Sequence, residues 1–122
     1  MSTGKNQPFV SRLRFAIAGI VHGLRTENSL RTQALVLLLV LILLGLLRPA
    51  PMWWALVILA GSAVVSAELF NTAVERLADH LHPDLHPEIR VVKDCAAGGV
   101  LVSALGAVGV AVALLISLIR NA

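Results

Sequence analysis

The sequence predicts an all-α membrane protein, with an N-terminal amphipathic helix on the membrane surface and three transmembrane helices. The first observation is composition, because 57% of the 122 residues are hydrophobic and only 14% are charged, whereas soluble proteins carry roughly 25% charged residues. The second is the presence of three charge-free runs, of 16, 19 and 25 residues, at 32–47, 49–67 and 95–119. Since about 17 to 25 apolar residues span a bilayer, each run predicts one spanning helix.

We expect a single integral-membrane domain over residues 1–122. Its predicted elements are an amphipathic helix at 9–26 and spanning helices at 32–47, 52–80 and 95–119. In the amphipathic helix at 9–26, five apolar residues share an arc of about 80°, namely Phe9, Leu13, Ile17, Ile20 and Leu24. Such a helix is typical of one that lies on the cytoplasmic leaflet.

The first span is nearly all Leu and Val, so we expect it to face lipid and to do little chemistry. Pro49 and Pro51 prevent it from continuing, and Trp53 and Trp54 mark the outer membrane boundary, where such rings settle. The second span starts there and extends into the cytoplasm at its other end.

Basic residues are distributed unevenly, and this orients the chain. Five of the ten precede the first span and two more, Arg90 and Lys93, lie between the second and third spans. Because cytoplasmic loops carry an excess of Lys and Arg, we predict a multi-pass protein of the cell inner (plasma) membrane. Its N-terminus and second loop would be cytoplasmic and its C-terminus outside. We expect no nucleic-acid partner, since the positive charge serves topology.

A polar stripe lies at the end of the second run. Helical residues are about 100° apart, so Glu68, Asn71, Glu75 and Asp79 fall within an arc of about 80°. No basic residue shares the stripe, and Arg76 points about 80° away from Glu68. We therefore expect a cation from outside this helix to meet the acids.

The depth of Glu68 in the membrane follows from its spacing. It lies 15 residues after Trp53, which is about 22 Å along a helix in a hydrocarbon core about 30 Å thick. Glu68 is thus expected just inside the cytoplasmic interface, with Glu75 and Asp79 projecting into the cytoplasm. Ionisable groups at membrane depth normally face a bundle interior or water. Three helices would shelter the stripe poorly, so we expect a homo-oligomer.

The chemistry suited to these residues is that of magnesium and phosphate. The chain contains no phosphate-binding loop, dinucleotide-binding glycine pattern, zinc-protease helix or nucleophile elbow. It does contain hard oxygen ligands at Glu27, Glu68, Glu75 and Asp79, with Lys93 at the water boundary. Mg²⁺ prefers one or two carboxylates plus substrate phosphates, and a lysine can neutralise phosphoryl oxygens.

A family resemblance rests on two sequence runs. Residues 68–75 read Glu-Leu-Phe-Asn-Thr-Ala-Val-Glu, and they are followed by Asp79 and by Lys-Asp-Cys-Ala-Ala-Gly-Gly-Val at 93–100. This pattern is long and specific, and it resembles the small integral-membrane diacylglycerol and undecaprenol kinases of prokaryotes. The resemblance covers nearly the whole chain. It implies a homotrimeric helical bundle with active sites shared between subunits, which uses MgATP to phosphorylate the hydroxyl group of a bilayer lipid.

The resemblance also implies roles for the residues near the membrane boundary. Glu68 resembles the catalytic base of the family, and Asn71 resembles the amide that positions the reacting groups. Glu27 and Glu75 resemble the two glutamates that bind Mg²⁺.

A second set of residues resembles the nucleotide site. Lys93 resembles the lysine that binds the phosphates of ATP, with Asp79 and Asp94 as polar partners. Asp84 and His86 fall where an acid and a histidine contact the nucleotide in the diacylglycerol branch.

The resemblance divides over the lipid substrate. The diacylglycerol branch carries an acid at the position of Gln33 and the undecaprenol branch a histidine, so the chain matches neither. The pattern Lys-Asp-x-Ala-Ala-Gly at 93–98 leans towards undecaprenol kinases. Both reactions stay open: diacylglycerol to phosphatidic acid, and undecaprenol to undecaprenyl phosphate.

Two interpretations compete with a kinase. The stripe could be a solvated helix end, which accounts for Asp79 and Glu75 but poorly for Glu68 and Asn71. Alternatively the chain could be a small oligomeric ion or proton transporter that uses Glu68. Broken helices and a midplane position would favour a transporter, and Glu68 has neither.

Other interpretations also exist for the histidines of the second loop and for Glu27. His80, His82 and His86 could bind a transition metal, although prolines among them favour a hydrated loop. Glu27 and Arg31, four residues apart, could form an ordinary surface ion pair.

Overall fold

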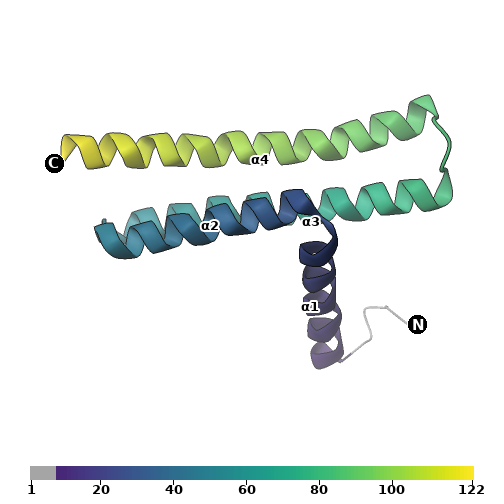
Figure 1. The fold of residues 1–122 in the computed structure, drawn as a ribbon, viewed down its shortest axis with the longest axis horizontal. Helices are drawn as coiled ribbons and strands as arrows, with labels where there is room; N and C mark the ends of the chain where they lie inside the picture. The colour runs from purple at the N-terminus through teal and green to yellow at the C-terminus, as the bar shows by residue number, and fades with distance from the viewer. Residues whose placement is uncertain (1–7) are drawn as a thin grey trace.

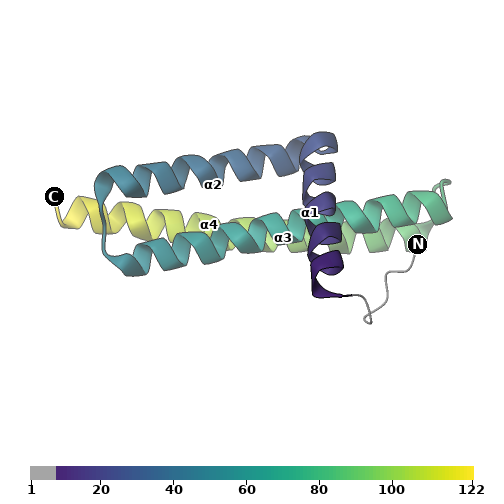
Figure 2. The ribbon, with the colours of Figure 1, turned by 90° about the horizontal axis from the view of Figure 1, so that it is seen from below.

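The computed structural model describes residues 8–122 and consists, over that range, of four α-helices. Their bounds are α1 Phe9–Thr26, α2 Asn28–Leu47, α3 Pro51–Leu81 and α4 Pro87–Arg120. Figures 1 and 2 show α2, α3 and α4 lying along one common axis, with successive helices antiparallel, and α1 projecting steeply from them. The three long helices are each long and apolar enough to cross a membrane, which confirms the predicted all-helical fold with three spans.

Helix length exceeds span length in α3 and α4. The helices α2, α3 and α4 contain 20, 31 and 34 residues, or about 30, 46 and 51 Å at about 1.5 Å per residue. A hydrocarbon core is about 30 Å thick, so α3 and α4 extend beyond it. In Figure 1 they continue together past the corner between α1 and α2. This two-helix extension carries the polar end of the stripe.

Prolines and one left-handed residue set the helix ends. Pro51 and Pro87 each occupy the first turn of their helices, where a missing N–H costs no hydrogen bond. The helix α2 ends because Arg48 takes φ 51°, and its N–H donates to the Leu44 carbonyl at 2.9 Å. Pro49 follows directly and prevents the helix from resuming.

The apolar core lies where α2, α3 and α4 meet, near the ends joined by the first loop. Leu44, Val57 and Leu114 are buried there, one from each helix. Nearby, a Cβ built on Gly61 would overlap the side chain of Leu37. The absence of a side chain at Gly61 therefore allows α2 and α3 to approach closely.

Most of α4 is uncovered within one chain. It packs on α3 along one side, and its other faces expose large apolar residues, including Leu101, Val102, Leu105, Val108, Leu115 and Ile119. Its glycines, at 98, 99, 106 and 109, have no neighbouring atom near the position of a Cβ. Such a surface suits lipid or the small-residue contacts of another membrane helix.

Candidate active site

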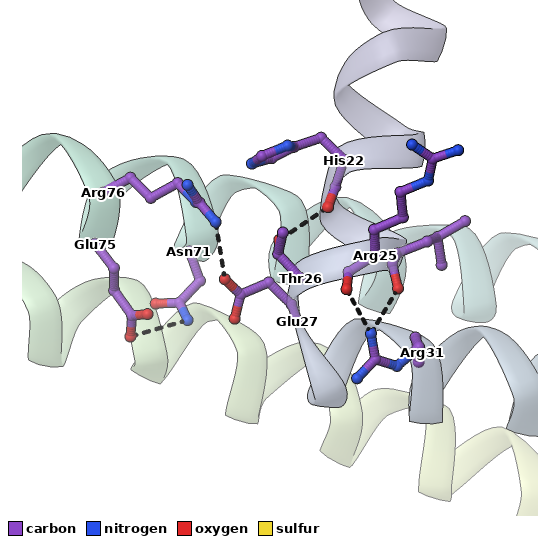
Figure 3. Close-up of polar contacts among 9 residues, drawn as sticks. His22, Arg25, Thr26, Glu27, Arg31, Asn71, Glu75 and Arg76 are labelled. Atoms are coloured by element: carbon purple, nitrogen blue, oxygen red, sulfur yellow. Dashed lines mark hydrogen bonds and ion pairs between the residues drawn. The ribbon is translucent and has the colours of Figure 1, made fainter.

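The corner between α1 and α2 is a single extended residue, Glu27, with φ −114° and ψ 115°. Its N–H donates to the Gly23 carbonyl at 2.9 Å. The guanidinium of Arg31 donates through Nη1 to the carbonyls of Leu24 at 3.0 Å and Arg25 at 2.9 Å (Figure 3). These carbonyls belong to the last turn of α1, where helix carbonyls lack partners and carry partial negative charge. Arg31 therefore caps α1 and fixes the corner.

Close packing places this corner against α3. A Cβ built on Gly23 would lie 2.7 Å from Leu30 Cδ2 and 3.1 Å from Leu69 Cδ2. Gly23 and Leu30 are buried, and Leu30 has no exposed surface. The end of α1 and the first turn of α2 thus pack beside the residue that follows Glu68.

Glu68 is buried inside a single chain. Its exposed fraction is 5%, and the hydroxyl of Ser29, on α2, donates to its Oε2 at 3.1 Å. Among residues 8–122, Glu68 forms no ion pair within its own chain, and this hydroxyl group is its one side-chain partner. The expectation that three helices leave it unsheltered is wrong, because the α1–α2 corner covers it.

Asn71 and Glu75, about one and two helical turns beyond Glu68, contact each other. Asn71 Nδ2 donates to Glu75 Oε1 at 3.4 Å (Figure 3). Over the part of the chain that the structure describes, Asn71 Oδ1 is the one buried side-chain oxygen or nitrogen without a hydrogen-bond partner. Burying a polar atom without a partner is costly, which points to a ligand at this amide oxygen.

Glu27 forms an ion pair with a residue of α3 rather than with Arg31 of the adjoining α2. Arg76 Nη2 lies 3.7 Å from Glu27 Oε1 (Figure 3). The interpretation of Glu27 as an i,i+4 partner of Arg31 is wrong, because Arg31 is engaged with the end of α1. Figure 3 draws Glu27 of the corner in one region with three residues of α3, Asn71, Glu75 and Arg76.

These residues fit a magnesium ion as a partial ligand set. Glu27 and Glu75 supply carboxylates, and Asn71 supplies the unpartnered amide oxygen. Among residues 8–122, no group of three His, Cys, Asp or Glu side chains is arranged to hold a metal by itself. Mg²⁺ does not require such a cage, because it commonly takes one or two carboxylates and completes its coordination with phosphate and water.

A second cluster joins α3 to α4 farther along the stripe. The Lys93 ammonium hydrogen-bonds to the Asp79 carboxylate, which confirms for Asp79 the expected cation from outside the helix. Asp94 lies 4.0 Å from the guanidinium of Arg90, and both are exposed.

Four of the five predicted nucleotide residues surround one hollow of about 190 Å³. Its lining residues are His82, Pro83, Asp84, Leu85, His86, Ile89, Arg90, Lys93 and Asp94. Asp79, the fifth, reaches this cluster through its bond to Lys93. The loop and the start of α4 thus gather cationic, anionic and ring groups at one place.

The histidines of this loop have structural contacts. The rings of His82 and His86 lie with centroids 5.1 Å apart. His86 Nδ1 accepts a hydrogen bond from the N–H of Glu88 at 3.1 Å and so caps α4. The His82 Nδ1 lies 3.1 Å from the Asp84 carbonyl. The transition-metal interpretation gains no support, because the described residues hold no metal-binding group of three.

Along α3 the clusters follow a fixed order. From Glu68 to Glu75 is about 10 Å along the helix, and from Glu75 to Asp79 about 6 Å more. The buried Glu68 near the end of the apolar run is followed by the Asn71–Glu75 pair and then by the hollow that Lys93 lines.

The fold and this site define a small helical protein with membrane-length helices and a buried carboxylate near the end of the apolar run. The chain belongs to the prokaryotic diacylglycerol kinase family, whose family model matches residues 14–115. The resemblance inferred from residues 68–75 and 93–100 is thereby confirmed.

Two relatives bear different names. The chain is 33% identical to a Synechocystis sp. diacylglycerol kinase over 96 residues, which cover 78% of this chain and 55% of the relative. It is 34% identical to a Bacillus subtilis undecaprenol kinase over 87 residues, which cover 71% of each. The match thus spans about half the length of the first relative.

Three contacts at the site were not anticipated from the sequence. These are the bond from Ser29 to Glu68, the pair between Arg76 and Glu27, and the capping of α1 by Arg31. The first two join residues far apart in the chain, and no pattern within one helix signals them.

Proposed function

We propose that this chain is an ATP-dependent lipid kinase, which transfers the γ-phosphoryl group of MgATP to the hydroxyl group of a bilayer lipid. The observation that carries the proposal is Glu68, a carboxylate with an exposed fraction of 5% near the end of a membrane-length apolar run. Its partner is a hydroxyl group and not a cation, so its basic oxygen is not neutralised. Family membership supports the same reaction class.

In this reaction, Glu68 accepts the proton of the lipid hydroxyl as general base. The hydroxyl oxygen forms a bond to the γ-phosphorus, the bond from that phosphorus to the bridging oxygen breaks, and ADP leaves. Asn71, one turn away, positions the reacting groups. Lys93 neutralises charge on the ATP phosphates.

Glu27, Glu75 and the Oδ1 atom of Asn71 would hold Mg²⁺. The ion, when bound, neutralises charge on the phosphate oxygens. Two of its proposed ligands, Asn71 and Glu75, lie along α3 between the base and the lysine, and Glu27 faces α3 from the α1–α2 corner. This order would place the lipid hydroxyl at Glu68, the γ-phosphate beside the metal ligands and the nucleotide towards the Lys93 of the same or a neighbouring chain.

The hollow at the start of α4 would receive the nucleotide. Asp94, Asp84 and His86 line it with Lys93, and Asp79 holds the lysine. The ring of His86 could contact the base of the nucleotide, and the carboxylates could accept hydrogen bonds from its ribose or amino group.

The proposed setting is a homotrimer in the cell inner membrane with active sites shared between subunits. The N-terminus and the second loop would be cytoplasmic, α1 would lie on that surface with its apolar face in the lipid, and the C-terminus would be outside. The uncovered, glycine-containing face of α4 supports packing between chains.

The substrate is a lipid alcohol, with diacylglycerol and undecaprenol as the two candidates. The relatives bearing these names have nearly equal identity to the chain, 33% and 34%. The transporter interpretation has no supporting observation, since α3 is one continuous helix from Pro51 to Leu81.

The test is phosphate transfer from radiolabelled ATP by the purified full chain in lipid micelles. Diacylglycerol and undecaprenol are supplied in separate reactions, and the product is identified by thin-layer chromatography. Label in one lipid supports the proposal and names the substrate. Glu68→Gln should reduce transfer by about 10²- to 10⁴-fold with ATP binding retained. Absence of label in both lipids would refute the kinase function, whereas near-normal transfer by Glu68→Gln would refute the role of Glu68 as general base.

A further inference from the structure

The first turn of α2 contributes a side chain to Glu68. Ser29 lies two residues after the corner residue Glu27, and its hydroxyl donates to Glu68 Oε2 at 3.1 Å. Glu68 is buried with an exposed fraction of 5%. Within residues 8–122, this is the one hydrogen bond formed by the Glu68 carboxylate. Ser29 is therefore the group that sets which way the carboxylate faces.

The place of Ser29 is fixed by its neighbours on both sides. Leu30 is fully buried and packs beside Gly23. Arg31 holds the last carbonyls of α1. These contacts fix the backbone of the first turn of α2. They therefore hold the Ser29 hydroxyl beside Glu68.

A general base needs one free oxygen and a fixed orientation. A carboxylate has two oxygens, and the hydroxyl of Ser29 engages one of them. Oε1 has no hydrogen-bond partner within the described residues. A base held in this way keeps Oε1 for the incoming proton and loses fewer orientations when substrate binds.

We propose that Ser29 is a positioning residue for Glu68, whose hydroxyl fixes Oε2 so that Oε1 receives the proton of the lipid alcohol. Ser29 acts through Glu68 and touches no substrate. The inference rests on the proposed kinase function, because it assigns Ser29 to the base of that reaction.

Kinetic constants of two Ser29 variants test the role. Ser29→Ala should lower kcat about tenfold, because a hydrogen bond to a charged group is lost, and should leave the KM for ATP unchanged. Ser29→Thr keeps the hydroxyl and should restore most of the rate. Thr32→Val is the matched control, since the Thr32 hydroxyl donates to the Asn28 carbonyl of its own helix at 3.0 Å. A kcat for Ser29→Ala within twofold of the wild type would overturn the proposal.

A double-mutant comparison separates positioning from general damage. In a Glu68→Gln background, Ser29→Ala should cause little further loss of kcat, because the base it positions is already absent. If the losses of kcat caused by Ser29→Ala and Glu68→Gln multiply in the double mutant, Ser29 does not act through Glu68.

Thermal unfolding of the same chain distinguishes failure of this inference from failure of the kinase function. The stability changes of Ser29→Ala and Glu68→Leu should be non-additive if the hydrogen bond exists. Additive changes would overturn the contact whatever the activity. A wild-type chain that transfers no phosphate would refute the kinase function and with it the catalytic role of Ser29, while non-additive stability would still confirm the contact.

Discussion

A metal ion at the proposed site would compete with Arg76 for Glu27, so removing Arg76 should tighten metal binding. Arg76 Nη2 lies 3.7 Å from Glu27 Oε1, with side-chain exposed fractions of 51% and 30%. An ion pair this exposed contributes about 0.2 to 1 kcal/mol. A cation that binds Glu27 must displace the guanidinium, so the pair lowers metal affinity by about 1.4- to 5-fold. We expect Arg76→Gln to raise the affinity for a divalent ion by this factor.

The measurement is binding of Mn²⁺, as a substitute for Mg²⁺, to the nucleotide-free chain, followed by the paramagnetic resonance signal of free Mn²⁺. Arg76→Lys retains the charge and should remain near the wild-type affinity. Arg120→Gln removes the same charge near the C-terminus, which Figure 1 shows far from the α1–α2 corner, and should have no effect. Unchanged or weaker Mn²⁺ binding by Arg76→Gln would refute the competition.

Three further predictions concern the metal site, the packing and the assembly. Glu75→Gln should raise the Mg²⁺ concentration needed for half-maximal activity before it alters lipid affinity, and an unchanged titration would count against Glu75 as a ligand. Gly61→Ala should lower the free energy of unfolding by about 1 to 3 kcal/mol relative to Gly45→Ala, whose Cβ would meet only Trp54, at 3.9 Å. Equal unfolding free energies would contradict the close approach of α2 and α3. Glu68→Gln and Lys93→Leu, each inactive alone, should recover activity when their subunits are mixed.

The spanning helices were well predicted from the sequence, because the length of a charge-free run reflects the length of helix that lies in the hydrocarbon core. Hydropathy does not report how far a helix continues into water. The third span was expected at 95–119, whereas α4 starts at Pro87, because a proline at the first turn and the His86 cap allow a charged segment to be helical. The length of the extension beside α3 was therefore missed.

The site was predictable only where it follows the period of one helix. The stripe on α3 follows from spacing of about 100° per residue. The sequence also predicted that a cation from outside the helix would meet these acids, and the structure identifies that cation for Asp79 as Lys93. Contacts made by the α1–α2 corner depend on how α1 and α2 pack against α3. That packing rests on Gly23 fitting between two leucine side chains, so the partners of Glu68 and Glu27 could not be read from periodicity.

The mixing experiment decides whether one chain or two build each site. Within one chain the corner already buries Glu68, but the Lys93 and Asp79 side chains remain 36% and 62% exposed.

A nucleotide bound at Lys93 would thus lie on an open surface, beside the uncovered face of α4. A second chain packed on that face would cover the nucleotide, and its Glu68 could then work with this Lys93. In mixed assemblies of Glu68→Gln and Lys93→Leu subunits, which in the proposed homotrimer share their sites, a site that takes one intact residue from each partner should be active. The recovered fraction should follow subunit statistics. If cross-linking shows that subunits exchanged and activity stays absent, each chain carries a complete site along its own α3.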